Sequence, residues 1–88
     1  MSYHLDFTEK ALQDIDFHKK SGNKVILKKL YKFLNELSDN PFVGTGKPEA
    51  LKYSLSGAWS RRLNKEHRLI YEVVNNVVYI LSVRGHYQ

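Results

Sequence analysis

The spacing of the apolar residues changes near Asp39-Asn40-Pro41, and this change limits the folds that are open to the chain. On the C-terminal side of this break, β-branched and aromatic residues gather in short runs that are typical of strands. On the N-terminal side, apolar residues recur at the spacing of one helix face, at Ile26, Leu30, Phe33, Leu34 and Leu37. Helices followed by strands, without regular alternation of the two, predict an α+β fold.

Two helices are expected before this break. Residues 3–7 alternate as a short first strand does, and Thr8 can cap a helix that begins at Glu9 and ends near Lys20. Ser21-Gly22-Asn23 then supplies a glycine stop and a second capping residue, after which the second helix follows. Its lysines can be read as a solvated outer face or as a strip that faces RNA phosphates.

Three strands are expected in the last third, over residues 58–63, 67–74 and 77–83. Asn75-Asn76 suits a two-residue hairpin turn, because asparagine tolerates positive φ angles. This register pairs Val74 with Val77 and puts Arg68 on one sheet face with Ile70, Glu72, Tyr79 and Leu81. We therefore expect a single domain over residues 1–88, with two N-terminal helices packed on one face of a twisted antiparallel sheet of four or five strands.

Charge and composition narrow the kinds of partner. Lys and Arg outnumber Asp and Glu by 14 to 9, and the net charge of +5 favours a polyanion such as RNA or an acidic protein. Cysteine is absent and the four histidines are scattered, so we expect neither a metal site nor another cofactor. Without a signal peptide or a run of about 20 apolar residues, we expect a cytoplasmic protein without membrane contact.

Three side chains together could carry out RNA cleavage. A metal-free ribonuclease needs a base for the 2′-hydroxyl, cations for the phosphate and an acid for the leaving 5′-oxygen. Glu49 follows Lys47-Pro48, Arg68 lies in an expected strand, and His86-Tyr87 stands near the end of the chain. Taken singly, each of these residues is more typical of an ordinary surface or ion-pair position.

Four segments in the second half resemble a known toxin family. They are Gly46-Lys47-Pro48-Glu49-Ala50-Leu51-Lys52, 55–63 (LSGAWSRRL), 66–71 (EHRLIY) and His86-Tyr87. In order and spacing they are similar to the YoeB/Txe toxins of the RelE/ParE fold group, whose fold is also like that of microbial ribonucleases. The helical half resembles this family only in its pattern.

The resemblance implies a ribosome-dependent endoribonuclease that cuts mRNA in the ribosomal A site. Its products would carry a 2′,3′-cyclic phosphate and a 5′-hydroxyl, and a Phd/YefM-like antitoxin would silence it. A homodimer is a further expected assembly. The implied roles are general base for Glu49, general acid for His86, main phosphate clamp for Arg68, phosphate contacts for Lys47, Lys52 and Arg62, and nucleotide positioning for Tyr87. The alternative is a non-catalytic toxin of this fold, such as a ParE-like gyrase inhibitor, or an RNA-binding domain.

The position of His86 depends on Gly85. An unbroken strand continuing from Val83 would put His86 on the sheet face opposite Arg68. Gly85 and the additional Gln88 depart from the family pattern. Our hypothesis is that the chain turns at Gly85 and brings His86 back towards Arg68.

Overall fold

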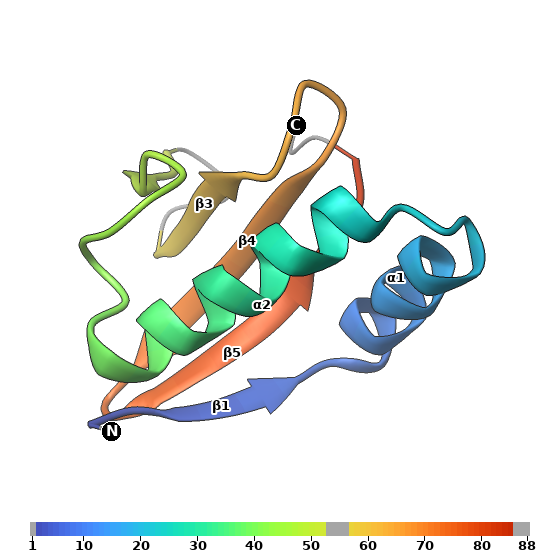
Figure 1. The fold of residues 1–88 in the computed structure, drawn as a ribbon. Helices are drawn as coiled ribbons and strands as arrows, with labels where there is room; N and C mark the ends of the chain where they lie inside the picture. Colours follow the sequence, from blue (N-terminus) through green and yellow to red (C-terminus); the bar gives the residue numbers. More distant parts are fainter. Residues whose placement is uncertain (1, 53–56, 86–88) are drawn as a thin grey trace.

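The fold places two helices on one face of a five-stranded sheet (Figure 1). The computed structural model describes residues 2–52 and 57–85. Neither helix in this part of the chain is long and apolar enough to cross a membrane. The elements in chain order are β1 (His4–Phe7), α1 (Glu9–Lys20), α2 (Lys24–Asp39), β2 (Glu49–Ala50), β3 (Ala58–Arg62), β4 (Arg68–Val74) and β5 (Val77–Ser82).

Both helices begin where the sequence predicts. The Thr8 side chain accepts a hydrogen bond from the backbone N–H of Ala11 at 3.1 Å and caps α1. The Asn23 side chain accepts one from Ile26 at 3.1 Å and caps α2. Thr8 Oγ1 also lies 3.1 Å from the carbonyl oxygen of Ile80, so this cap ties the start of α1 to β5.

The sheet has the strand order β1-β5-β4-β3-β2 and is mixed. Its last three strands form the expected antiparallel meander, and β2 adds to the outer edge of β3. β1, however, runs parallel to β5, with Leu5 opposite Val78 and Phe7 opposite Ile80. The expected layers and the antiparallel pairing are confirmed for β2 to β5, and only the direction of β1 departs from the expected antiparallel sheet. Alternation along a strand could not predict this direction, because it is the same whichever way the neighbouring strand runs.

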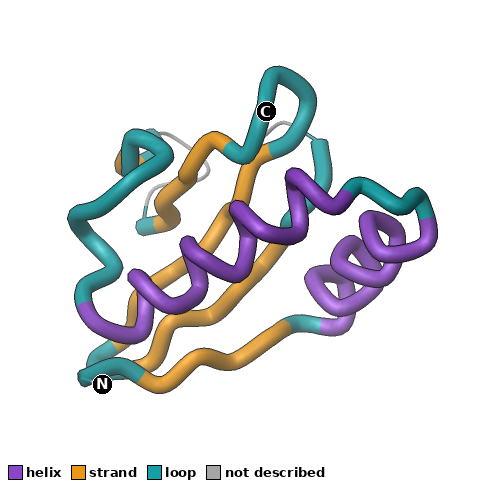
Figure 2. The backbone as a smooth tube through the Cα atoms, viewed as in Figure 1, coloured by secondary structure: helices purple, strands orange, loops and turns teal. Residues whose placement is uncertain are grey.

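The main core lies between the helices and the sheet, which form two layers in the backbone view (Figure 2). Helix α2 supplies the apolar stripe that its sequence predicts, and alternate positions of the strands meet it. The fully buried members include Leu30, Phe33 and Leu37 of α2, Leu69 and Tyr71 of β4, and Val78 and Ile80 of β5.

The register of β4 and β5 follows the prediction only as far as a bulge. Val74 lies opposite Val77 and Tyr71 opposite Ile80, and Asn75 has the positive φ of 55° that its turn requires. Continued past Tyr71, the predicted register would pair Ile70 with Leu81, but Ile70 lies opposite Ser82, so the predicted register ends at this bulge. The extra residue in β5 changes which face the following residues occupy.

Removal of the α1 cap should destabilise the protein. We predict that Thr8→Ala lowers the free energy of unfolding by about 1 kcal/mol, because the N–H of Ala11 loses its acceptor. Urea denaturation measures this change. Thr8→Ser keeps the hydroxyl and should retain most of the stability, and equal losses in both variants would contradict the role of the cap.

Candidate active site

The sheet face opposite the helices carries a small apolar cluster. Leu51, Ala58 and Ile70 are buried there, and Leu81 packs against them. Leu51 is held over the sheet by a 2.9 Å hydrogen bond from its N–H to the carbonyl of Ala58. We call this side of the sheet the open face, and this cluster covers part of it.

Glu49 belongs to this face. It begins the two-residue strand β2, which the sequence did not predict, and lies opposite Ser60 of β3. Residues directly opposite each other in an antiparallel pair share a sheet face, so Glu49 and Ser60 lie on the same side. The Glu49 side chain is exposed, so this candidate base is accessible to a large substrate.

Ser60 connects this position to the predicted phosphate clamp. Arg68 Nη1 donates a 3.1 Å hydrogen bond to Ser60 Oγ, and Ser60 itself is fully buried. The sequence prediction missed Ser60, although its alternation with Arg62 in β3 was a signal that the two share a face. A guanidinium held by such a bond keeps a defined direction before any phosphate binds.

Two arginines lie side by side on the open face. Arg62 is opposite Arg68 across β3 and β4, Arg62 exposed and Arg68 partly buried. Like charges at directly opposite positions repel each other, and an anion placed between them relieves that repulsion. Lys47 and Lys52 flank β2 in the chain and are exposed.

The predicted acid, His86, and Tyr87 lie outside the described residues. Gly85 is the last residue described, and it has the left-handed φ of +78° that a turn uses. Its carbonyl accepts a 3.0 Å hydrogen bond from the backbone N–H of Arg68. The described chain therefore ends beside Arg68, while the placement of His86 stays a prediction.

Arg61 precedes Arg62 in β3, and the sequence did not reveal the partners of its side chain. Its side chain is fully buried and pairs with Glu36 of α2, with Nη1 2.7 Å from Oε1. The same guanidinium donates to the carbonyl oxygens of Val43 at 2.9 Å and Thr45 at 3.3 Å. Arg61 thus fixes the loop that leads into β2 and Glu49.

Glu36 is the acidic partner in this arrangement. Partial burial raises its pKa, but hydrogen bonds from Thr45 and the charge of Arg61 outweigh that effect and hold the pKa below its usual value of 4.5. Both Glu36 oxygens contact the Thr45 hydroxyl, at 3.0 and 2.9 Å. The carboxylate is therefore the stable form over the neutral range.

No group of three His, Cys, Asp or Glu side chains in residues 2–52 and 57–85 is arranged to hold a metal ion. The residues that could bind a phosphate group are instead the cations of the open face, Arg62 and Arg68.

Comparison with solved structures places this fold among small bacterial toxins. A YoeB/ParE toxin from Agrobacterium tumefaciens superposes with a TM-score of 0.87 at 30% identity, covering 96% of this chain and 99% of that one. A YoeB dimer from Staphylococcus aureus gives a TM-score of 0.85 at 36% identity, covering 99% of this chain and 100% of that one.

Sequence relatives define the family. Residues 7–87 match the family described as YoeB-like toxin of bacterial type II toxin-antitoxin system. The toxin YoeB of Synechocystis is 43% identical over 84 residues, 96% of each chain, and that of Escherichia coli is 40% identical over 83 residues, 94% of this chain and 98% of the relative. The chain belongs to the YoeB-like toxins of bacterial type II toxin-antitoxin systems, which confirms the resemblance inferred from its sequence.

The Glu36–Arg61 pair predicts a specific dependence of stability on pH. Because the pKa of Glu36 is lowered by folding, its contribution is complete above the usual value of 4.5 and is lost as the pH falls through the folded pKa. We expect Glu36→Gln to cost about 1 kcal/mol of unfolding free energy at neutral pH. The difference from the unsubstituted protein should shrink as the pH falls below 4.5.

Urea titrations over this pH range measure the difference, with Glu9→Gln as control. Glu9 is an exposed carboxylate in the first turn of α1. A loss in Glu36→Gln that stays constant with pH would contradict the assigned role of the charge.

Proposed function

We propose that this chain is a ribosome-dependent, metal-independent endoribonuclease that cuts mRNA in the ribosomal A site, in the cytoplasm, and so inhibits translation. The observation that carries the proposal is the open face, where Glu49 and Arg68 both adjoin Ser60 and the described chain ends beside Arg68. Membership of the YoeB-like toxins supports the same activity.

The proposed reaction is an internal transfer at phosphorus. Glu49 takes the proton of the 2′-hydroxyl while the 2′-oxygen forms a bond to the adjacent phosphorus atom. The bond from phosphorus to the 5′-oxygen breaks, and His86 gives that oxygen a proton. The products are a 2′,3′-cyclic phosphate and a free 5′-hydroxyl, with no water consumed.

Arginine suits the charge that develops in this reaction. A guanidinium is permanently charged and can donate to two phosphate oxygens at once. Arg68, directed by its bond to Ser60, serves as the main clamp, and Arg62 beside it adds a second charge. Lys47 and Lys52 contact flanking phosphates, and Tyr87 positions the nucleotide.

Loss of the base or of the acid should suppress cutting. We predict that Glu49→Gln and His86→Ala each lower the rate of mRNA cleavage on translating ribosomes by about 10²- to 10⁴-fold. Primer extension maps the cuts, and single-turnover rates quantify them. Glu9→Gln, which changes a carboxylate on the helical layer, should cut at the unsubstituted rate.

Two results would count against the proposal. Undiminished cutting by both Glu49→Gln and His86→Ala would refute their assigned roles. Intact mRNA together with DNA damage in expressing cells would point to a gyrase-directed toxin of the same fold.

We also propose that an acidic antitoxin of the Phd/YefM type silences the chain by covering the open face. A relative from Staphylococcus aureus, 38% identical, has been solved as a YoeB-YefM complex, and another structure from that species is a YoeB dimer. The net charge of +5 and the paired arginines suit carboxylates from such a partner. A homodimer is the other assembly that we propose.

The charge of Arg62 gives a test of this partner. Arg62→Glu should weaken binding of the protein encoded by the neighbouring reading frame at least about tenfold. The introduced carboxylate would face the carboxylates of that acidic partner, and like charges repel each other. Lys28→Glu makes the same change at an exposed site on α2 and should have little effect. Isothermal titration at two salt concentrations measures both, and equal weakening would refute the assigned surface.

A further inference from the structure

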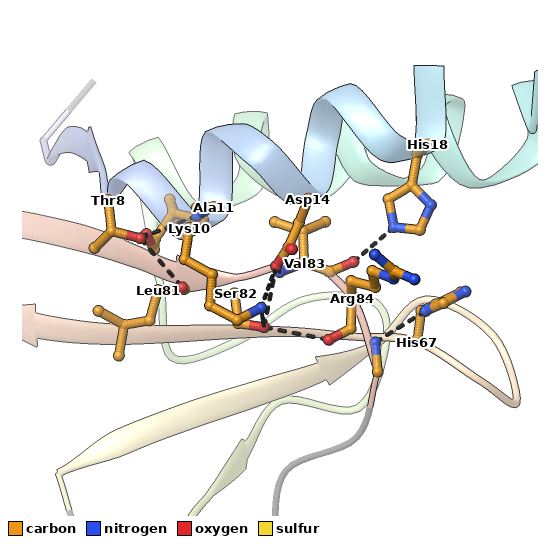
Figure 3. A network of polar contacts seen from close by, with 12 residues as sticks. Thr8, Lys10, Ala11, Asp14, His18, His67, Leu81, Ser82, Val83 and Arg84 are labelled. Atoms are coloured by element: carbon orange, nitrogen blue, oxygen red, sulfur yellow. Dashed lines mark hydrogen bonds and ion pairs between the residues drawn. The ribbon is translucent and has the colours of Figure 1, made fainter. Parts of the chain in front are cut away.

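The three residues that follow β5 in the described chain are held mainly by side chains and not by the strand register (Figure 3). β5 ends at Ser82, and the residues after it have no place in the strand register. Side chains of α1 and of the segment before β4 take over their backbone polar groups. We call residues 83–85 the exit segment, because it leads to His86.

Val83 is bound by two buried side chains of α1. Its N–H donates to Asp14 Oδ2 at 3.0 Å, and its carbonyl accepts from His18 Nε2 at 2.7 Å. Asp14 is 6% exposed and His18 is 1% exposed, and the two stand one helical turn apart. Both polar groups of the Val83 backbone are therefore satisfied inside the protein by one helix.

Gly85 is bound on the other side. Its N–H donates to His67 Nδ1 at 2.9 Å, while its carbonyl accepts from the N–H of Arg68 at 3.0 Å. The rings of His18 and His67 meet edge to face, with their centres 4.8 Å apart. The two histidines therefore contact each other, and each binds one backbone group of the exit segment. His18 binds the Val83 carbonyl, and His67 binds the Gly85 N–H.

The exit segment is bound at several points by groups from other elements. Buried polar side chains are costly unless they are fully bonded. Here the exit segment receives hydrogen bonds at both Val83 and Gly85, and the Arg84 guanidinium lies 3.6 Å from the centre of the Phe17 ring. One of its partners is the backbone of Arg68, the proposed phosphate clamp.

We propose that His67 is a positioning residue for the proposed ribonuclease reaction, on which this inference rests. By accepting the N–H of Gly85, it fixes the backbone immediately before the proposed acid His86 relative to Arg68. The bond requires a His67 ring with no proton on Nδ1, so the neutral ring carries its proton on Nε2. His67 itself neither gives nor takes a proton in the reaction.

Two substitutions separate the acceptor from the ring. His67→Asn offers a carbonyl oxygen close to the place of Nδ1, and His67→Phe keeps a ring against His18 but has no acceptor. We expect His67→Phe to lower kcat for mRNA cleavage by about 10- to 100-fold with KM nearly unchanged, since a misplaced catalytic group costs rate and not substrate binding. His67→Asn should recover most of the loss.

Hydrogen exchange tests the anchor without reference to activity. In the full-length protein, the Gly85 amide should exchange at least about tenfold faster in His67→Phe than in the unsubstituted chain or in His67→Asn. Unchanged exchange and unchanged kcat in His67→Phe would overturn the proposal. So would a loss of kcat that His67→Asn does not restore while Gly85 stays protected.

A third comparison distinguishes this proposal from the proposed function. If His67 acts through His86, then adding His67→Phe to His86→Ala should change the residual rate by less than about twofold. A full further loss would show that His67 acts elsewhere. If the unsubstituted protein does not cut mRNA at all, the proposed function fails; if it cuts and His67→Phe cuts equally well, only the positioning role fails.

Discussion

The buried guanidinium of Arg61 is the interaction on which the rest of the arrangement depends. It joins β3 to α2 through Glu36, to the following loop through Val43 and Thr45, and to β4 through the hydroxyl of Tyr71 at 3.3 Å. A buried cation is costly unless each of its donors is satisfied, so these segments can pack around it in few ways. These contacts fix the loop that contains Val43 and Thr45, and they therefore also fix the position at which β2 joins the sheet.

The open face is assembled from segments that are distant in the sequence. β2 supplies Glu49, β3 supplies Ser60 and Arg62, β4 supplies Arg68, and the exit segment closes against the start of β4. Hydrogen bonding between β2, β3 and β4 sets the spacing of their residues on this face before any substrate binds. Such a rigid arrangement is what electrostatic stabilisation of a phosphate transition state requires, because the charges need not reorganise during the reaction.

Local signals in the sequence predicted local structure well. Thr8 and Asn23 cap the two helices, and Asn75 makes the hairpin turn, because each choice depends on a few neighbouring residues. The parallel direction of β1, the short strand β2 and the bulge between β4 and β5 depend on contacts across the fold, and no local pattern specifies them. The partners of Arg61 were missed for the same reason, since α2, the loop and β4 lie far from it in sequence.

Buried polar groups occur where the two ends of the open face are fixed. On one side, Arg61 and Glu36 hold the loop that precedes Glu49; on the other, the side chains of α1 and His67 hold the exit segment. A small domain has little core to offset such burial, and an apolar pair in these places would stabilise it as well or better. Hydrogen bonds add direction, which apolar packing lacks. The polar anchors therefore fit the proposed reaction, which needs a base and the residue before an acid to be placed with precision; in that proposal the helices support chemistry on the opposite face.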